Sequence, residues 1–134
     1  MTKESLLAAL PFRVGDFTVR AAVREDIDRR ADWPAYPPPW DMFDAHSKGW
    51  DEARRRRAWI AMRDLALDEV FLACEGAGVP LLGWFVLREI DWEKGEVGNM
   101  SIRLHPEFCD HGVGTLLSAG IFAWCHEQGF GRLR

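Results

Sequence analysis

The segment with the clearest chemical potential runs from Ile102 to Leu117, where a strand-like alternation passes through a short loop into an amphipathic run. Gly112 and Gly114 stand at the start of that run, and glycine permits a tight turn and a close approach of the backbone to a ligand. The unpaired N–H groups and the dipole at a helix N-terminus together favour a phosphate. Two glycines alone are a weak indication, because glycine also closes loops that bind nothing.

Two familiar phosphate-binding loops do not fit this spacing. A dinucleotide-binding G-x-G-x-x-G loop requires glycine where Leu117 stands, and a P-loop requires Gly-Lys-Ser/Thr, which residues 112–116 lack. Short turns connect the preceding strands, so we expect them to be antiparallel, unlike the strands of a βαβ unit. The loop therefore predicts an anion site of another kind.

Four side chains around the loop raise two alternatives, a metal site and a nucleophilic cysteine. They are His105, Cys109, Asp110 and His111. No second ligand pair such as C-x-x-C accompanies them, so we expect no metal. A nucleophilic Cys109 would need a base, and no assembled triad is visible in the sequence.

Hydrophobic periodicity predicts the elements that must position this loop. Alternation predicts a strand at 17–21, and apolar runs separated by turns predict a meander of strands at 70–74, 81–90 and 96–105. Helices are predicted at 24–31, 51–67 and 113–128, and residues 130–134 resemble the start of another strand.

The last predicted helix has the clearest pattern, with an apolar face that leaves Phe122 and Cys125 outside it. That face comprises Val113, Leu116, Leu117, Gly120, Ile121 and Trp124. The stretch from Trp33 to Trp50 is rich in proline and aromatic residues, which predicts a loop that either packs its aromatics on the core or forms a pocket wall.

Composition limits the classes of partner. The chain has 134 residues, enough for one domain, and its net charge of −4 argues against nucleic acid or an anionic membrane as partner. The longest late apolar stretch, Val79 to Leu87, is far below the roughly 20 residues of a membrane span. Three cysteines without close pairing favour a reducing compartment, so we expect a cytoplasmic protein.

The register of Leu104, Pro106, Gly112 and Gly114 resembles the acyl-CoA loop V-x-P-x-x-[R/Q]-x-x-G-x-[G/A] of the Gcn5-related N-acetyltransferase (GNAT) superfamily. Cys109 departs from that pattern, which usually has Arg or Gln there. The predicted order of a strand, two helices, three strands and a helix also resembles the first part of the family's α+β fold with its mixed sheet. The resemblance implies one GNAT-like domain over 1–134 that stops before a further strand, helix and two strands.

The resemblance implies acetyl-CoA as cosubstrate and an N-acetyltransferase acting on an unidentified small-molecule or peptide amine, or the N-terminal part of such an enzyme. It implies that Ile102 and Leu104 bind the pantetheine arm. The implied pyrophosphate site comprises Cys109, Asp110, His111, Gly112, Val113 and Gly114, with the Thr115 hydroxyl as an extra donor. The alternatives are a non-catalytic acyl-CoA-binding or interaction module, and a structural domain whose loop binds nothing.

Gly98 stands where several relatives place a basic glutamate, six residues before Leu104. Glu96, two residues earlier on the same strand face, is therefore the predicted catalytic residue, acting through water, with a plain hairpin-end carboxylate as the alternative. The family's tyrosine acid belongs to the part that follows the third helix, and Tyr36 in the first loop is the only tyrosine. We therefore expect weak or no activity from this chain alone, and a homodimer or C-terminal complementation.

Overall fold

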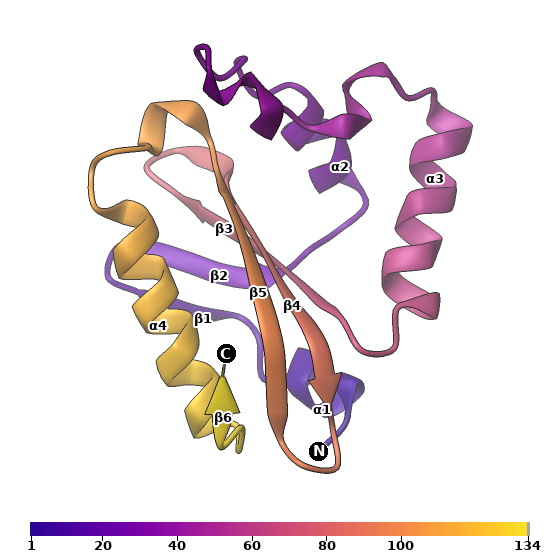
Figure 1. Cartoon of the computed structure of the whole chain (residues 1–134), viewed down its shortest axis with the longest axis vertical. Coiled ribbons are helices and arrows are strands. Elements are labelled where there is room, and N and C mark those ends of the chain that lie inside the picture. The colour runs from indigo at the N-terminus through magenta and orange to yellow at the C-terminus, as the bar shows by residue number, and fades with distance from the viewer. Residues whose placement is uncertain (134) are drawn as a thin grey trace.

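The computed structural model describes residues 1–133, which form a six-stranded sheet with helices on both faces (Figure 1). In chain order the elements are α1 (Lys3–Ala8), β1 (Phe12–Val14), β2 (Phe17–Ala21), α2 (Glu25–Ala31), α3 (Glu52–Ile60), β3 (Val70–Gly76), β4 (Val79–Asp91), β5 (Glu96–Leu104), α4 (Val113–Glu127) and β6 (Arg132–Leu133). The strands lie side by side in sequence order, antiparallel throughout except for the parallel pair β5–β6. The predicted α+β class with a mixed sheet is confirmed.

Each segment predicted as a strand or helix contains an element of that type, and the structure adds α1 and β1, which were not predicted. Of the predicted strand at 130–134, Arg134 lies outside the described residues. α1 is only six residues long and begins with a capping box, in which the Thr2 hydroxyl accepts from the Ser5 N–H and the Ser5 hydroxyl accepts from the Thr2 N–H. Its Leu6 is buried in the core.

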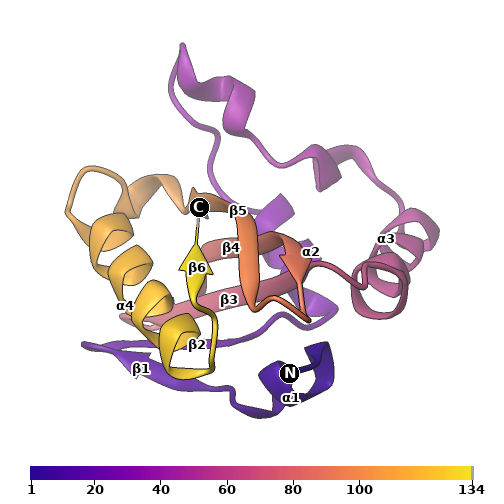
Figure 2. The ribbon, with the colours of Figure 1, turned by 60° about the horizontal axis from the view of Figure 1, so that its bottom comes forward.

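Two hydrophobic clusters lie on opposite faces of the sheet. Figure 2 shows the helices that cover these faces. The larger cluster joins α1 and α4 to the strands, and includes Leu6, Leu72, Phe85, Leu87, Leu117 and Ile121. The smaller one lies on the face of α2 and α3, and includes Ala22, Trp33, Ala73, Leu81, Trp84 and Val86. Each face of the sheet is thus covered by its own helices.

The buried face of α4 is rotated relative to the predicted one. Leu116, which we expected inside, is 45% exposed, whereas Cys125, expected outside, is fully buried beside Trp124. The unpredicted strand β1 explains the difference, because α4 packs closely on it: a Cβ at Gly120 would lie 2.5 Å from Val14 Cγ2. Glycine there lets the helix approach β1 and turns Leu116 towards solvent.

A kink in the β4–β5 pair changes which face the side chains point to. Leu87 and Ile90 of β4 both enter the α4 cluster although they are three residues apart, which regular alternation forbids. Between them Glu89 has a positive φ of 53°, a strained conformation for this residue. The facing position is Gly98, where a Cβ would lie 2.8 Å from Glu89 Cβ. The kink therefore requires glycine at position 98.

The outer edge of β5 is open along most of its length. Among residues 1–133, only the start of β5 has an outer strand neighbour, with Glu96 and Val97 paired to β6 (Figure 1). The N–H of His105 donates to Leu82 of β4 at 2.8 Å. Because main-chain groups alternate in direction along a strand, those of Leu104 and Ile102 point to the open edge.

A buried ion pair fixes α2 to the sheet. Asp26 is fully buried and accepts two hydrogen bonds from the Arg20 guanidinium, at 2.7 and 2.8 Å. It also accepts from Arg29 at 2.9 Å and from the Val23 N–H at 2.8 Å. Both oxygens of the Asp26 carboxylate thus accept two hydrogen bonds each. Because Arg20 belongs to β2, this ion pair fixes the position of α2, the helix that also carries Arg30.

A π-helical turn, Ala61–Leu65, follows directly after α3. Lys3 of α1 donates hydrogen bonds to carbonyl groups at this turn. Lys3 Nζ donates to the Met62 carbonyl at 3.1 Å and to the Ala66 carbonyl at 2.6 Å. Burial lowers the pKa of the Lys3 ammonium despite the acidic residues near it. Within the described chain, no helix combines the length and the apolar character needed to cross a membrane.

Candidate functional site

The loop between β5 and α4 turns at two positions with positive φ, Asp110 at 64° and Gly112 at 76°. Gly112 is the N-cap of α4, where no side chain makes a capping hydrogen bond and no acidic residue occupies the first turn. The first N–H groups of the helix therefore have neither an intrahelical nor a side-chain partner, and the positive end of its dipole is uncompensated. An anion is the natural complement of this end.

The predicted cofactor-binding residues fall into two groups that the structure brings together. Cys109, Asp110, His111, Gly112, Val113, Gly114 and Thr115 form the loop and the first turn of α4, and Ile102 and Leu104 lie on the open edge of β5. A Cβ at Gly114 would lie 3.0 Å from Leu104 Cδ1, so the helix start touches the end of the strand. The loop between β5 and α4 and the open edge of β5 therefore form one continuous surface.

Cys109 is held as a neutral thiol. Its Sγ lies 3.8 Å from the His105 carbonyl oxygen, and burial together with the nearby Asp110 carboxylate raises the pKa of the thiol. His105 is also committed, because its Nδ1 accepts from the Glu107 N–H at 3.1 Å and its ring packs edge-on against Trp33. Neither side chain is arranged as part of a nucleophilic pair.

Tyr36 reaches the same strand end from the first loop, a contact that its sequence context did not reveal. Its hydroxyl donates to the Leu104 carbonyl, one of the groups that point to the open edge. Burial raises the pKa of Tyr36 to about 12, with the neighbouring Cys109 adding to the effect, so the phenol is protonated at neutral pH. A cavity of about 230 Å³ lies here, lined by Tyr36, Phe43, Ile102, Arg103, Leu104 and Cys109.

Two carboxylates lie along the strand pair away from the loop. Glu96 is at the hairpin end of β5, opposite Asp91, eight residues or about 26 Å of extended strand from Leu104. The structure does not bring Glu96 to the loop. Glu89 was not singled out from the sequence, yet its Oε2 lies 2.7 Å from where a Cβ on Gly98 would stand.

The loop from Trp33 to Trp50 does both things that its composition suggested. Trp33 is buried and its indole N–H donates to the Leu81 carbonyl at 3.0 Å, which anchors the loop to the core. Trp40 is 55% exposed and stacks on Phe43 at 6.1 Å between ring centroids. These outer aromatics line the cavities above the strand end. The loop therefore builds the wall that faces the open edge.

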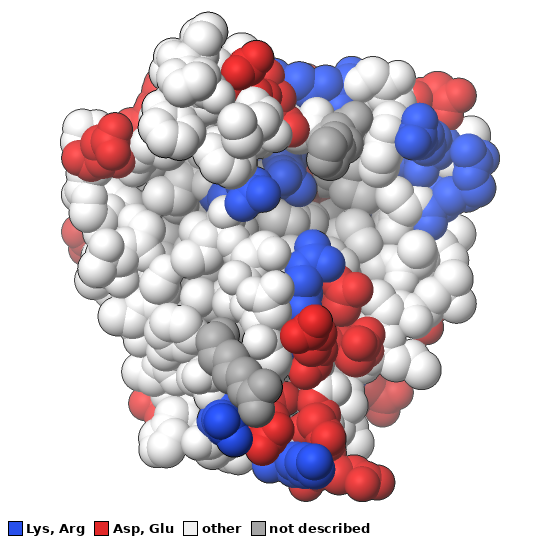
Figure 3. Space-filling view, viewed as in Figure 1, with Lys and Arg blue, Asp and Glu red and all other residues white. Residues whose placement is uncertain are grey.

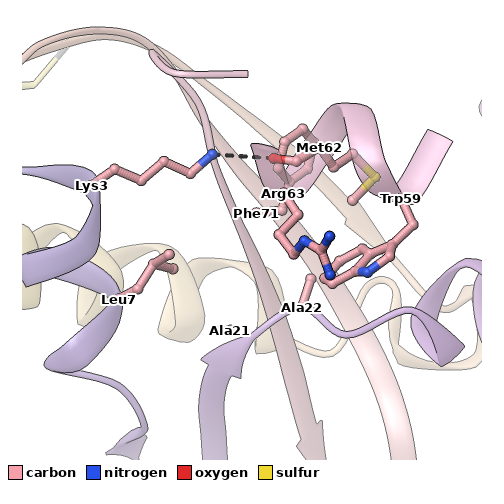
Figure 4. Close-up of a pocket in the computed structure, with 8 residues that line it drawn as sticks. All are labelled: Lys3, Leu7, Ala21, Ala22, Trp59, Met62, Arg63 and Phe71. Carbon is pink, nitrogen blue, oxygen red and sulfur yellow. Dashed lines mark hydrogen bonds between the residues drawn. The ribbon is translucent and has the colours of Figure 1, made fainter. Parts of the chain in front are cut away.

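A separate cavity of about 230 Å³ lies where α1, α3 and β3 meet (Figure 4). Its lining comprises Leu7, Ala21, Ala22, Trp59, Met62 and Phe71, with Lys3 and Arg63 at its polar side. The Lys3 amine already donates to main-chain carbonyls. Without an acid or hydroxyl in its lining, this cavity is not suited to general acid–base chemistry.

Comparison with solved structures identifies the fold. A chimera of the spermidine N-acetyltransferase SpeG from Vibrio cholerae and hSSAT superposes with a TM-score of 0.64 at 18% identity, over 84% of this chain and 64% of that one. The ribosomal-protein-S5-alanine acetyltransferase of Vibrio fischeri gives 0.57 at 12% identity, over 92% and 72% of the two chains. The GNAT domain of PAT from S. lividans gives 0.57 at 17% identity, over 87% and 69%.

No family model matches the sequence, and no curated protein matches it. The chain spans just under two thirds of the length of the first of the three structures. At these identities the likeness concerns the fold alone. The chain therefore has the fold of the Gcn5-related N-acetyltransferase superfamily.

Proposed function

We propose that the chain binds acetyl-CoA along the open edge of β5 and transfers the acetyl group to an amine. The observation that carries the proposal is the continuity of two features: the edge that presents the N–H groups of Ile102 and Leu104, and the uncapped start of α4. The carbonyl groups of the same two residues already accept from Arg103 and Tyr36. An extended arm can hydrogen-bond to an unpaired strand edge, and a pyrophosphate to free helix N–H groups. The loop residues Cys109 to Thr115 are the proposed pyrophosphate contacts.

In this arrangement the thioester would lie up the strand from the loop, towards the kink at Gly98. Glu89 and Glu96 are the proposed sources of the base that removes a proton from the attacking amine. Glu89 projects its carboxylate over Gly98, the position at which relatives carry a glutamate, whereas Glu96 would act through water. Direct transfer agrees with the neutral state of the Cys109 thiol.

The test of the cofactor proposal is the melting temperature of the chain with and without acetyl-CoA. A ligand that binds only the folded chain adds about 2.7 kcal/mol at 100 times its dissociation constant, so the melting temperature should rise. Pantetheine and adenosine 3′-phosphate 5′-diphosphate, added separately, report on the strand edge and on the loop. No shift with acetyl-CoA contradicts the proposal, and a shift without thiol release from any amine favours an acyl-CoA-binding module.

The same open edge is the proposed site of self-association. An unpaired strand edge recruits another strand, and Gly98 to Leu104 offer one. If the edge serves both purposes, acetyl-CoA competes with the second copy, so sedimentation should show a dimer that dissociates as cofactor is added. The three cysteines are free thiols, which fits a reducing compartment such as the cytoplasm as the proposed location.

A further inference from the structure

Three arginines from three different elements converge on one cavity on the α2–α3 face of the sheet. Arg30 of α2, Arg88 of β4 and Arg103 of β5 line a space of about 210 Å³, roofed by the loop through Phe43. Figure 3 shows blue side chains near the centre of the view, below the segment at its top. The cavity is next to the open edge, because Phe43 and Arg103 also line the cavity at the end of β5.

The positive charge of this cavity is only partly neutralised. Arg88 lies 3.1 Å from the Glu69 carboxylate, but among residues 1–133 neither Arg30 nor Arg103 has a carboxylate oxygen within 4.0 Å. Asp44, the acid in the lining, accepts from the Tyr36 N–H at 2.9 Å instead. Two guanidinium groups are thus held in a cavity without an ionic partner.

Burial and the like charges of the neighbours act against the charged form of Arg30. Burial lowers the pKa of its guanidinium, and the positive charges of Arg103 and then Arg88 lower it further. In proteins a half-buried guanidinium group is ordinarily paired with a carboxylate. An anionic ligand in this cavity would relieve both the desolvation and the mutual repulsion.

Aromatic rings hold the two unpaired guanidinium groups in place. The Arg103 Cζ lies 4.9 Å from the Phe43 ring centroid, and the Arg30 Cζ lies 5.6 Å from that of Trp84. Such contacts use the flat face of the guanidinium and leave the N–H edge of Arg30 for a ligand. Arg103 donates from Nη1 to the Ile102 carbonyl at 2.8 Å, so only its other N–H groups are left for a ligand. Paired N–H groups match the two oxygens of a carboxylate or phosphate. The arginines are therefore preorganised for an oxyanion.

A larger apolar cavity continues from the arginine cavity beneath α2 and α3. It has a volume of about 320 Å³, shares Arg30, Trp84 and Arg88 with the arginine cavity, and extends to Trp50 and Phe71. A ligand can therefore place an oxyanion on the arginines and an apolar group beyond them, with its remaining end directed to the open edge. The arginine cavity, the apolar cavity and the cavity at the open edge are therefore connected, and together they suit a ligand with an oxyanion, an apolar group and a third, reacting end.

We propose that the amine acceptor of this chain is an anionic amine, whose carboxylate or phosphate is bound by Arg30, Arg88 and Arg103. The inference rests on the proposed acetyl transfer for its chemistry, but the anion site itself does not depend on it. A polycation such as spermidine, the substrate in the printed name of one structural neighbour, would meet repulsion at these arginines. The amine of an anionic acceptor would instead lie towards the thioester on β5.

The first experiment measures binding without acetyl-CoA. 3-Phenylpropionate, which has a carboxylate and a ring but no amine, should raise the melting temperature of the wild-type chain in a saturable way. The shift should vanish in the double variant Arg30→Met/Arg103→Gln and persist in Arg57→Gln, which removes an exposed arginine of α3. No shift in the wild type overturns the anion site, whatever acetyl-CoA does. Loss of the shift in the presence of free CoA assigns the arginines to a cofactor phosphate and overturns the acceptor class.

The second experiment measures transfer with matched pairs of amines. Phenylalanine and phenethylamine differ by one carboxylate, and phosphoethanolamine and ethanolamine by one phosphate, so the pairs distinguish the two sources of the anion. The member of at least one pair that carries the carboxylate or phosphate should have a kcat/KM tenfold or more above its partner without that group. That ratio should fall to near one in the double variant and stay unchanged in Arg57→Gln. A preference for spermidine or for the amines without an anionic group overturns the proposal.

Discussion

Replacing Asp26 by asparagine removes the charge that joins α2 to the sheet and keeps the size of the side chain. Asp26 is fully buried against Arg20 and Arg29, and loss of one partner of a buried ion pair costs about 3–5 kcal/mol because the other charge stays unpaired. Arg20 keeps Glu75 at 3.1 Å and the Pro80 carbonyl at 2.9 Å. We therefore expect the lower end of that range, about 3 kcal/mol.

Calorimetry converts this cost into a melting temperature. An unfolding entropy of about 2.1 cal/mol/K per residue gives about 0.28 kcal/mol/K for 134 residues, so Asp26→Asn should melt about 11 °C lower. The matched control is Asp64→Asn, which breaks the exposed pair with Arg63 at 2.8 Å and should leave the melting temperature nearly unchanged, because solvent screens that pair. Equal shifts in the two variants would refute the reasoning.

The same ion pair predicts a pH dependence. Burial opposes ionisation of Asp26, but the hydrogen bonds from Arg20, the Val23 N–H and Arg29 outweigh it, so the pKa of the carboxyl lies below its ordinary value. A lowered folded-state pKa contributes stability that is complete above the unfolded value, about 3.9, and is lost as pH falls through the folded value. The difference between wild type and Asp26→Asn should be constant near neutral pH and shrink below about pH 4. A difference that persists undiminished at pH 2 contradicts the assignment.

Three further predictions concern the site. Gly114→Val should weaken acetyl-CoA binding in calorimetric titration, because its Cβ would stand 3.0 Å from Leu104 Cδ1 and push the helix start from the strand; unchanged affinity would remove this loop as the site. Tyr36→Phe frees the Leu104 carbonyl for the pantetheine arm, so cofactor affinity should rise about 2- to 10-fold, the worth of one hydrogen bond, and a loss would show that the phenol itself contacts the ligand. Glu89→Gln should lower the thiol-release rate by about 10²-fold or more at neutral pH and less at high pH, where the amine is already deprotonated; a larger effect in Glu96→Gln would make that residue the base.

Long periodic segments were predictable because each one carries its own pattern. The alternation of β2 recurs in the structure with the predicted ends, and the apolar runs of β3 and β4 recur with ends shifted by at most two residues. α1 and β1 were missed because six and three residues are too short for a period to emerge. That omission also produced the error in α4, since the position of Leu116 depends on a strand that the pattern did not indicate.

The candidate site divides in the same way. The loop was visible because Gly112 and Gly114 are two residues apart and adjoin the helix that they open. Tyr36 and Leu104 are 68 residues apart in sequence, and no local pattern links them. Glu89 acquires its place from a backbone kink opposite Gly98, and a single sequence gives no indication of such a kink. The positions of Tyr36 and Glu89 in the candidate site are set by contacts between different elements.

The loop from Trp33 to Trp50, which forms the wall facing the open edge of β5, is closed at its own base. Lys48 Nζ donates to the Trp33 carbonyl at 2.9 Å, and Arg55 ties the far end to Asp28 at 2.6 Å, so the chain leaves and rejoins the body at neighbouring points. Residues 34–47 between these ties can lengthen or change composition with little entropic penalty, since loop closure depends only weakly on length. For the proposed acetyl transfer this means that the acceptor could change by exchange of this one segment, as antibodies diversify their loops on a constant framework, while the strand edge proposed for the acyl donor stays as it is.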